Sequence, residues 1–302
     1  MSTNSDKFIQ NNSNVNRNNV LNMRNFIKNW VSKSVCWILD WLPSLILGRH
    51  VYEVAIAQIM IKQKEILHQR HSLIFSVPNR LNLYRVETFA TKEPETLEWI
   101  ESLPSNSVLW DVGANIGLYS VYAAVARRCN VWAFEPSVFN LELLARNIAL
   151  NKLQESICIV PIALSDQIGS SMFKMSNTQW GGALSTFGQN FDQDGKELRQ
   201  VFEYQTLGLS IDDACVLLKI PQPQYLKMDV DGIEHLILSG GKNTLRLVDS
   251  VLIEINDKFV QQAEQCAAVL KSAGLILYRK CDLGVPGQYN QWWIRSQQTL
   301  ED

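Results

Sequence analysis

The stretch from Val108 to Ala124 constrains the fold more than any other part of the chain. It opens with a compact apolar run, passes through two glycines, Gly113 and Gly117, and continues with apolar residues at helical spacing. A short run rich in β-branched and aromatic residues suits a strand that is buried on both faces. A strand that leads into a helix through a glycine-containing turn is typical of the nucleotide-binding corner of an open α/β sheet. The pattern therefore predicts a ligand site at this turn.

The turn itself indicates which ligand it binds. Asp111 precedes the first glycine, the loop does not fit the Gly-x-Gly-x-x-Gly pattern, and no Gly-Lys-Ser/Thr follows. A carboxylate here would repel a pyrophosphate but would suit a cofactor with a cationic amino group. S-adenosylmethionine has an ammonium group, a sulfonium group and no phosphate. We therefore expect this cofactor, with Asp111 as the complementary charge and with contacts from the loop residues Gly113, Ala114, Asn115 and Gly117.

A second acidic residue supports a cofactor with a ribose. Glu135 ends another strand-like run, Val131–Phe134, about 20 residues after the glycine loop, which is where an acidic residue receives ribose hydroxyls. We expect Pro136 and Ser137 to border the cofactor too, with Ser137 as the N-cap of the next helix. NAD enzymes share this acid, so only Asp111 separates the two cofactors. The alternative is an ordinary buried strand–turn–helix with surface acids.

Four motifs resemble one known family when they are taken together and in order. Their sequence positions are Thr91–Thr96, Trp110–Ala124, Phe134–Ser137 and Leu226–Glu234. In this order they are similar to the FkbM-type family of S-adenosylmethionine-dependent methyltransferases, and the resemblance extends from about Thr91 to about Asn256. One position departs from the family. Asp231 stands where the usual Asp-x-Glu-Gly-x-Glu motif has a glutamate, so its carboxylate is one methylene shorter.

The resemblance implies a fold, a reaction and one further contact. The fold is a Rossmann-like class I methyltransferase domain of the α/β class, with a seven-stranded, mostly parallel sheet, an antiparallel last strand and helices on both faces. The reaction is O-methylation of a small hydroxylated molecule, such as a sugar or a natural-product intermediate. Glu93 would lie beside the amino group of the cofactor; the alternative is that it only marks the start of a helix. Rival interpretations are an NAD-dependent enzyme and a non-catalytic interaction module of the same fold.

The third strand and the segment after it should border the other end of the cofactor. Ile157–Ala163 is strand-like, and in this architecture the following loop lies beside the adenine ring. We expect Ala163, Leu164 and Asp166 there, although Asp166 could equally cap a turn. Residues 169–206 resemble a β-hairpin-like insertion. Its loop with Trp180-Gly181-Gly182 is either a site of substrate contacts or a mobile surface segment.

The candidate catalytic residues follow the fourth strand, which should lie beside the first. Asp229 would then open into the same cleft as Asp111. Methyl transfer to a hydroxyl requires a group that takes its proton. We expect this base to be Asp229 or His235, with Asp231 and Glu234 orienting, while His235 could instead be a packed or solvated helix residue. Paired carboxylates also suit Mg²⁺, which we weigh as a less favoured addition and not as an assigned metal site.

The chain divides into three parts. Residues 1–24 are rich in Asn and should be disordered, residues 25–70 form an apolar helical extension, and residues 71–302 form the methyltransferase domain. We expect a helix over Tyr52–Leu67 and strands over Ser72–Val77 and Leu81–Val86. The extension could pack on the catalytic domain, dimerise or rest on a membrane surface. Packing or dimerisation is favoured, because the basic flanks are sparse for attraction to anionic lipid.

Composition excludes several classes of function. The net charge of −2 and the absence of a basic stripe do not suit a nucleic-acid-binding protein. The six cysteines are scattered without a Cys-x-x-Cys pair, so free thiols in a reducing cytoplasm are expected rather than disulfides or a metal site. The 302 residues suffice for one α/β domain with an extension.

Overall fold

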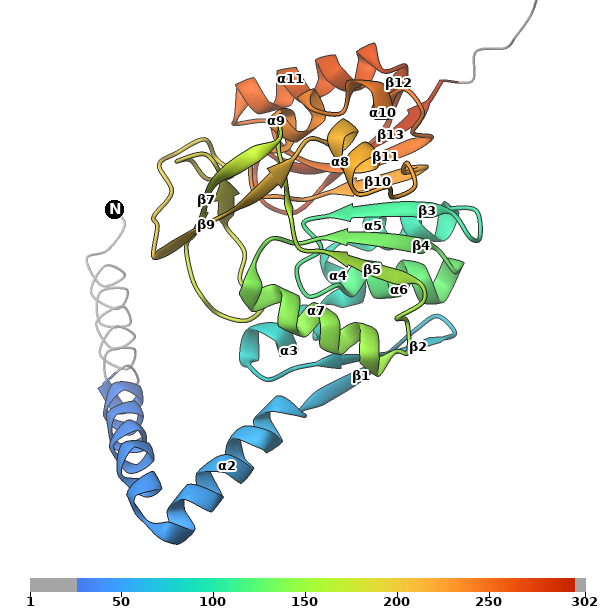
Figure 1. Cartoon of the computed structure of the whole chain (residues 1–302). Coiled ribbons are helices and arrows are strands. Elements are labelled where there is room, and N and C mark those ends of the chain that lie inside the picture. Colours follow the sequence, from blue (N-terminus) through green and yellow to red (C-terminus); the bar gives the residue numbers. More distant parts are fainter. Residues whose placement is uncertain (1–25, 297–302) are drawn as a thin grey trace, which may run out of the picture. The chain divides into compact units, whose positions relative to one another are not determined.

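The computed structural model describes residues 26–296, so the expected tail over residues 1–24 lies outside the described residues. The chain divides into two compact units, with the boundary between Ile61 and Lys62 (Figure 1). Among the described residues, none of the helices has the length and apolar character that crossing a bilayer requires.

The described part of the first unit, from residue 26 onward, consists of helices. A helix over residues 26–41 is followed by the 3-10 turn η1 (Leu42–Ser44) and by α2 (Ile46–Met60). Pro43 stands in the first turn of η1, where its missing N–H costs nothing, and it prevents the first helix from continuing.

The helix predicted over Tyr52–Leu67 is wrong at its end. The helix stops at Met60, and β1 (Gln63–His68) pairs antiparallel with β2 (His71–Ser76) in the second unit. Gln69 at the turn has a φ of +50°. Here cross-strand pairing overrides the helical spacing of the apolar residues.

The centre of the second unit is a seven-stranded sheet in the order β12-β13-β11-β10-β3-β4-β5. Its strands are β3 (Val108–Val112), β4 (Asn130–Phe134), β5 (Ile157–Val160), β10 (Tyr225–Met228), β11 (Ser250–Asn256), β12 (Leu275–Asp282) and β13 (Gln288–Arg295). The five consecutive strands from β11 to β5 are parallel, and β13 runs antiparallel between β11 and β12. This confirms the predicted fold class.

The two faces of the sheet bury different helices, because side chains alternate along each strand. Trp110 and Val112 belong to one hydrophobic cluster, together with residues of α8 to α11, whereas Leu109 belongs to the other, together with residues of α3 to α7. The bounds are α3 (Arg80–Glu87), α4 (Phe89–Lys92), α5 (Pro94–Ser102), α6 (Leu118–Arg127), α7 (Val138–Leu150), α8 (Ile211–Leu217), α9 (Glu234–Ser239), α10 (Lys242–Leu245) and α11 (Val260–Ser272).

Two local predictions fail. Leu81–Val86 is not a strand but part of α3, because the Asn79 side chain accepts a hydrogen bond from the Asn82 amide and caps this helix. Ser137 precedes α7 but makes no side-chain cap. Ser210 does cap α8 by accepting a hydrogen bond from the Asp213 amide at 3.0 Å.

The residues between β5 and β10 contain a small second sheet of four strands in the order β6-β9-β7-β8. Its strands are β6 (Ala163–Leu164), β7 (Gly169–Met175), β8 (Ser185–Phe187) and β9 (Phe202–Leu209). Two loops join its strands, one over residues 176–184 and one over residues 188–201. The first of these loops reaches the carboxyl end of the main sheet, as described below.

Candidate active site

Two loops cross at the carboxyl ends of the neighbouring strands β3 and β10. Gly113 has a φ of +81°, and a Cβ atom at this position would lie 1.9 Å from the backbone oxygen of Asp229. Only glycine allows so close an approach. The loop after β3 and the loop after β10 therefore form one continuous floor.

Two adjoining cavities open on this floor. The larger has a volume of about 250 Å³ and the smaller of about 60 Å³. Both are lined by the same five residues, which are Gly113, Asn115, Ala183, Asp229 and Asp231. A ligand that occupies both cavities would pass directly over the crossing loops.

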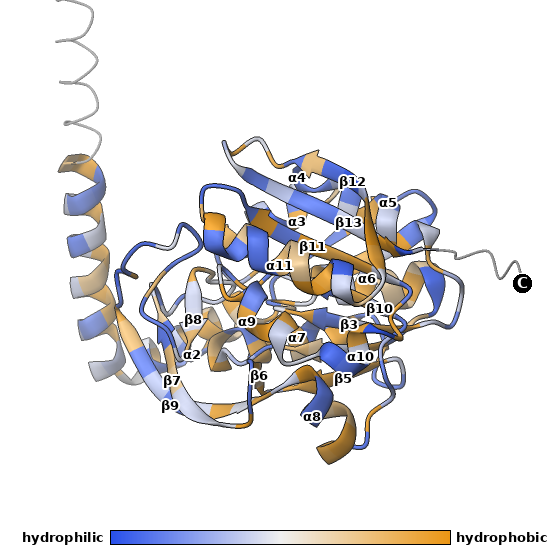
Figure 2. Cartoon of the chain, turned by 90° about the horizontal axis from the view of Figure 1, so that it is seen from above, coloured by the Kyte–Doolittle hydropathy of each residue, from blue (hydrophilic) through white to orange (hydrophobic). Residues whose placement is uncertain are grey.

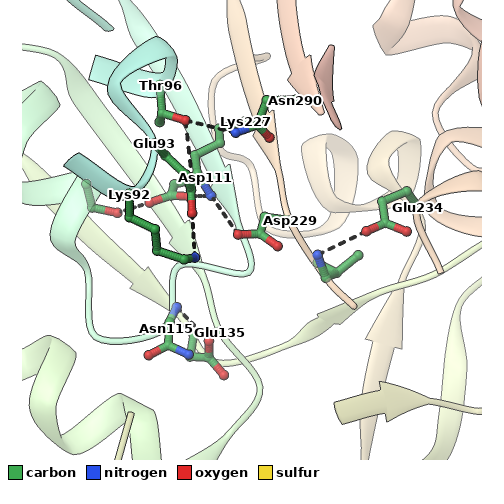
Figure 3. A network of polar contacts seen from close by, with 12 residues as sticks. Lys92, Glu93, Thr96, Asp111, Asn115, Glu135, Lys227, Asp229, Glu234 and Asn290 are labelled. Carbon is green, nitrogen blue, oxygen red and sulfur yellow. Dashed lines mark hydrogen bonds and ion pairs between the residues drawn. The ribbon is translucent and has the colours of Figure 1, made fainter. Parts of the chain in front are cut away.

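Glu135 is the polar anchor of the smaller cavity. Its two carboxylate oxygens accept hydrogen bonds from the backbone amides of Asn115 at 2.7 Å and Ser137 at 2.8 Å. Burial raises the pKa of Glu135 to about 7, even though both amides favour the ionised form. Figure 3 shows Glu135 beside Asn115 at this end of the site. The carboxylate is therefore fixed in place before any ligand arrives.

The remaining walls of the smaller cavity are mostly apolar. They include Pro136, Ala163, Leu164 and several larger side chains, namely Phe134, Ile162, Phe173, Phe187 and Ile237. Asp166 is exposed and accepts a hydrogen bond from the Ser165 hydroxyl, so the structure does not bring it to the cavity. Gly117 is also absent from both linings, because it starts α6 and faces Leu144.

A series of charged side chains borders the larger cavity (Figure 3). Lys92 donates to Glu93 at 2.6 Å, and Lys227 lies 3.5 Å from Asp111 and 3.8 Å from Asp229. Burial would raise the pKa of Glu93, but Lys92 and Lys227 hold it below its ordinary value. Glu93 and Asp229 line the larger cavity, so both are placed to face a cationic ligand.

Asp111 does not lie where the sequence analysis expected it. It is only 1% exposed and is not among the lining residues of either cavity. One of its oxygens accepts a hydrogen bond from Ser120 at 2.6 Å, and the other faces Lys227. Its charge is compensated inside the protein, so direct pairing with the cofactor is a wrong expectation for this residue.

Lys227 is the site residue that the sequence analysis most clearly missed. Burial alone would lower its pKa, but Asp111, Asp229 and Glu93 raise it above the ordinary value, so the side chain stays charged. The sequence did contain a signal that pointed to this residue, because Lys227 is the charged residue within an otherwise apolar strand. A charged residue in a central strand needs a buried partner, and β10 pairs with β3 in a register that sets Lys227 opposite Asp111.

Asp231 binds the insertion rather than pointing freely into the cavity. Its side chain accepts hydrogen bonds from the amides of Leu184 at 2.7 Å and Ser185 at 3.2 Å. Burial and the nearby Asp229 raise its pKa to about 6. Its φ of +60° belongs to the left-handed region that non-glycine residues rarely adopt. The strained loop thus holds the start of β8 against the site.

Glu234 and His235 lie away from both cavities. Glu234 accepts hydrogen bonds from the amides of Val230 and Gly232 and from the side chain of Gln262, so it shapes the loop after β10. His235 packs against Phe191 and Phe259, at ring-centroid distances of 6.4 and 5.7 Å. The structure therefore does not bring these two expected catalytic residues to the reacting centre.

Glu254 is a second lining residue without an assigned role in the sequence analysis. It lies two residues before the end of β11, lines the larger cavity, and makes no hydrogen bond or ion pair with the residues that the structure describes. Burial, followed by the charges of Asp229 and Glu93, raises its pKa to about 10. Its carboxyl group therefore keeps its proton at neutral pH and can donate a hydrogen bond into the cavity.

The loop between β7 and β8 closes over the cavities through its backbone. The Gly182 oxygen accepts hydrogen bonds from the side chains of Asn115 at 2.8 Å and Asn140 at 3.1 Å, and the Gly181 oxygen accepts one from Arg85 at 2.9 Å. The Asn140 side chain is buried. The glycines of this loop are thus tied to the cofactor-binding loop itself.

These features fit S-adenosylmethionine. The buried carboxylate of Glu135 suits the two ribose hydroxyls, the apolar walls suit an adenine ring, and the acidic larger cavity suits the cationic amino acid end. Within residues 26–296, no three His, Cys, Asp or Glu side chains are grouped as a metal site would require. The fold and the site together define a Rossmann-like, S-adenosylmethionine-dependent methyltransferase.

The comparison with protein families gives the same result. The methyltransferase FkbM domain matches residues 111–279, which is more than half of the chain. The chain belongs to the FkbM methyltransferase family.

Two curated relatives are methyltransferases. Hexuronic acid methyltransferase AglP of Haloferax volcanii is 26% identical over 184 residues, covering 60% of this chain and 70% of that protein. Methyltransferase sdnD of Sordaria araneosa is 38% identical over 72 residues, covering 24% of this chain and 28% of that protein.

Among solved structures, a putative transferase of Pyrococcus horikoshii, PH0793, has a TM-score of 0.44 at 12% identity, covering 78% of this chain and 72% of that one. TYW2 of M. jannaschii in complex with AdoMet has a TM-score of 0.42 at 14% identity, covering 78% and 87%. The fold assignment rests on the order and direction of the strands, not on these scores.

Replacing Lys227 by Met should destabilise the protein strongly. The change leaves Asp111 buried without its cation, which costs about 3–5 kcal/mol in comparable buried pairs. Adding Asp111→Asn to Lys227→Met should recover part of this loss. Urea unfolding measures both changes. Lys196→Met is the matched control, since the Lys196–Asp194 pair is exposed and should matter by less than about 1 kcal/mol. Equal stability of the single and double variants would contradict the pairing.

The affinity for S-adenosylhomocysteine should fall as the pH drops below about 7. The ionised form of Glu135 accepts two ribose hydroxyls, whereas the protonated form has lost an acceptor, so affinity should fall by up to about tenfold per pH unit below its pKa. Calorimetric titration at pH values between about 5.5 and 8, in steps of about half a unit, measures the dissociation constant as a function of pH. Glu135→Gln should bind more weakly and with little pH dependence. An unchanged pH profile in this variant would assign the titration to another group, such as Asp231.

Proposed function

We propose that this methyltransferase transfers a methyl group to a hydroxyl of a small molecule, such as a sugar or a natural-product intermediate. The cofactor would occupy both cavities, and the acceptor would enter the larger one. S-adenosylmethionine supplies an activated methyl group, so the protein has to bind, align and deprotonate the acceptor.

The charge balance of the larger cavity is the observation that carries this proposal. Two of the three cations that line it pair with a carboxylate, namely Lys92 with Glu93 and Lys227 with Asp111, and the charge of Arg85 favours the ionised form of Asp231. Asp229 remains as a carboxylate beyond these three, whereas Glu254 keeps its proton. An acidic surplus disfavours a negatively charged acceptor atom and suits a neutral hydroxyl. The volume of about 250 Å³ suits a small acceptor beside the amino acid end of the cofactor.

The cofactor would be held by residues from three strand ends. Glu135 would bind the ribose, and Pro136, Ala163 and Leu164 would border the adenine. Glu93, which lines the larger cavity, would face the amino group. Gly113, Ala114 and Asn115 would lie beneath the cofactor, because they line the larger cavity at the crossing of the two loops.

Asp229 would take the proton of the acceptor hydroxyl. It lines both cavities and is one-third exposed at its side chain, so an acceptor can reach it. The ammonium group of Lys227 lies 3.8 Å from its carboxylate and would hold the side chain in position. Glu254, which keeps its own proton, would donate a hydrogen bond to another oxygen of the acceptor. A polyhydroxylated molecule offers such a second oxygen.

The relative AglP supports a sugar acceptor. AglP is named as a hexuronic acid methyltransferase, and it aligns with 60% of this chain. A sugar ring carries several neutral hydroxyls, which agrees with the pairing of cations and carboxylates described above.

Incubating the protein with methyl-labelled S-adenosylmethionine and a panel of acceptors tests the proposal. The panel contains neutral sugars, sugar acids, primary amines and simple carboxylic acids. We expect label on a hydroxyl oxygen, which mass spectrometry and NMR of the product locate. Label found on the amines or on the carboxyl groups, with the hydroxyls unmodified, would refute O-methylation.

Asp229→Asn should separate cofactor binding from methyl transfer. If Asp229 accepts the proton, turnover should fall by about 10²–10⁴-fold, while the affinity for S-adenosylhomocysteine stays within about threefold. A large loss of affinity would instead assign Asp229 to the cofactor. Asp166→Asn is the matched control, because Asp166 is exposed and outside both cavities; it should leave both quantities unchanged.

A further inference from the structure

The most apolar exposed surface of the described chain belongs to the first unit. In the helix over residues 26–41, every residue except Ser34 is exposed. Its large apolar side chains are accessible over 41–72% of their surface, and they are Phe26, Ile27, Trp30, Val31, Val35, Trp37, Ile38, Leu39 and Trp41. Exposed apolar surface of this extent marks an interaction site.

The apolar residues of this helix share one broad side, and most of its polar residues lie on a narrower strip. Phe26, Trp30, Trp37 and Trp41 recur at spacings of four and seven residues, so they share one side of the helix, which we name the tryptophan face. Trp37 and Trp41 stack with their ring centroids 6.4 Å apart. Figure 2 shows both hydrophobic and hydrophilic bands on this helix.

Three charged residues border the apolar side of the helix. At 100° per residue, Lys33 and Asp40 lie beside the tryptophan face, whereas Lys28 lies opposite it, between Val35 and Leu39. The charge asymmetry is broader than this helix. The first fifty residues contain six Lys or Arg and two Asp or Glu, whereas the rest of the chain contains 22 and 28. A basic N-terminal region thus adjoins an acidic remainder.

We propose that the helix over residues 26–41 lies in the interface of an anionic lipid surface. The tryptophan face would enter the boundary between headgroups and acyl chains, where indole rings with one apolar and one polar end are favoured. Lys28 and Lys33 would stay at the level of the lipid phosphates. A broad apolar side that contains several Trp residues, bordered by lysines and set in a basic N-terminal region, is typical of helices that lie on membranes.

The adjoining helix α2 extends this surface. Five of its large apolar residues are exposed, namely Leu47, Val51, Val54, Ile56 and Ile59, and so is Ile61, which follows the helix. Charged residues in α2 are few, namely Arg49 and Glu53. Two consecutive helices with a proline between them therefore supply a longer lipid-facing surface than one helix alone.

Flotation of the full chain with lipid vesicles tests this proposal. Vesicles of phosphatidylcholine alone are compared with vesicles that also contain phosphatidylglycerol. We expect the chain to float with the anionic vesicles, to bind the neutral ones more weakly, and to lose the difference at high salt, which screens charges. Absence of binding to both vesicles would overturn the proposal.

Two variants separate the contribution of the tryptophan face from that of the two lysines. Trp30→Ser/Trp37→Ser/Trp41→Ser should weaken partitioning into both vesicles by at least about tenfold. Lys28→Glu/Lys33→Glu should remove only the preference for the anionic vesicles. Val216→Ser/Leu217→Ser is the matched control, because these exposed apolar residues lie in α8 of the second unit; it should bind as the unmodified chain does.

Two further measurements exclude other occupants of the surface. Thermal unfolding and S-adenosylhomocysteine binding should be unchanged in the tryptophan and lysine variants, since these substitutions lie outside the second unit. Light scattering gives the mass of the chain in solution. A dimer that dissociates in the tryptophan variant would show that a second copy covers the tryptophan face, and undiminished vesicle binding by that variant would show that another segment binds lipid. Either result would overturn the proposal.

Discussion

The buried ammonium group of Lys227 is the interaction on which the site depends. It lies at the switch point of the sheet, within 4 Å of carboxylates from two adjacent strands, Asp111 and Asp229. Without a cation, these carboxylates and Glu93 would repel one another in a region of low dielectric constant. With Lys227 present, the surrounding loops can carry further acidic groups. The cavity keeps a negative potential that suits a cationic cofactor.

Burial and backbone hydrogen bonds act against each other throughout this site. Glu135 and Asp231 each accept two backbone amides, which favours ionisation, yet burial raises the pKa of both. Both groups thus titrate within one or two units of neutrality instead of near their ordinary values. The backbone is already arranged around them, so a ligand meets preorganised carboxylates whose charge is sensitive to its arrival.

The sequence predicted those parts of the site that local patterns determine. The strand and glycine loop at Val108–Gly117, the second acid Glu135 and the antiparallel last strand all follow from short motifs or from family resemblance. Lys227 and Glu254 belong to the site only because β3, β10 and β11 are neighbours in the sheet. A short sequence motif does not show which strands are neighbours. The segment Leu81–Val86 alternates like a strand, but the Asn79 cap turned it into a helix. His235 illustrates the reverse error, since proximity to Asp229 in sequence did not place it in the cavity.

Asn115 joins two functions that are often separate in enzymes. Its backbone amide donates a hydrogen bond to the Glu135 carboxylate in the smaller cavity, and its side chain donates one to the Gly182 oxygen in the loop between β7 and β8. Asp231 makes a similar connection from the opposite side. A substitution in residues 176–184 will therefore also disturb the glycine loop after β3. A change in the choice of acceptor during evolution must preserve these shared hydrogen bonds if the glycine loop is to keep its conformation.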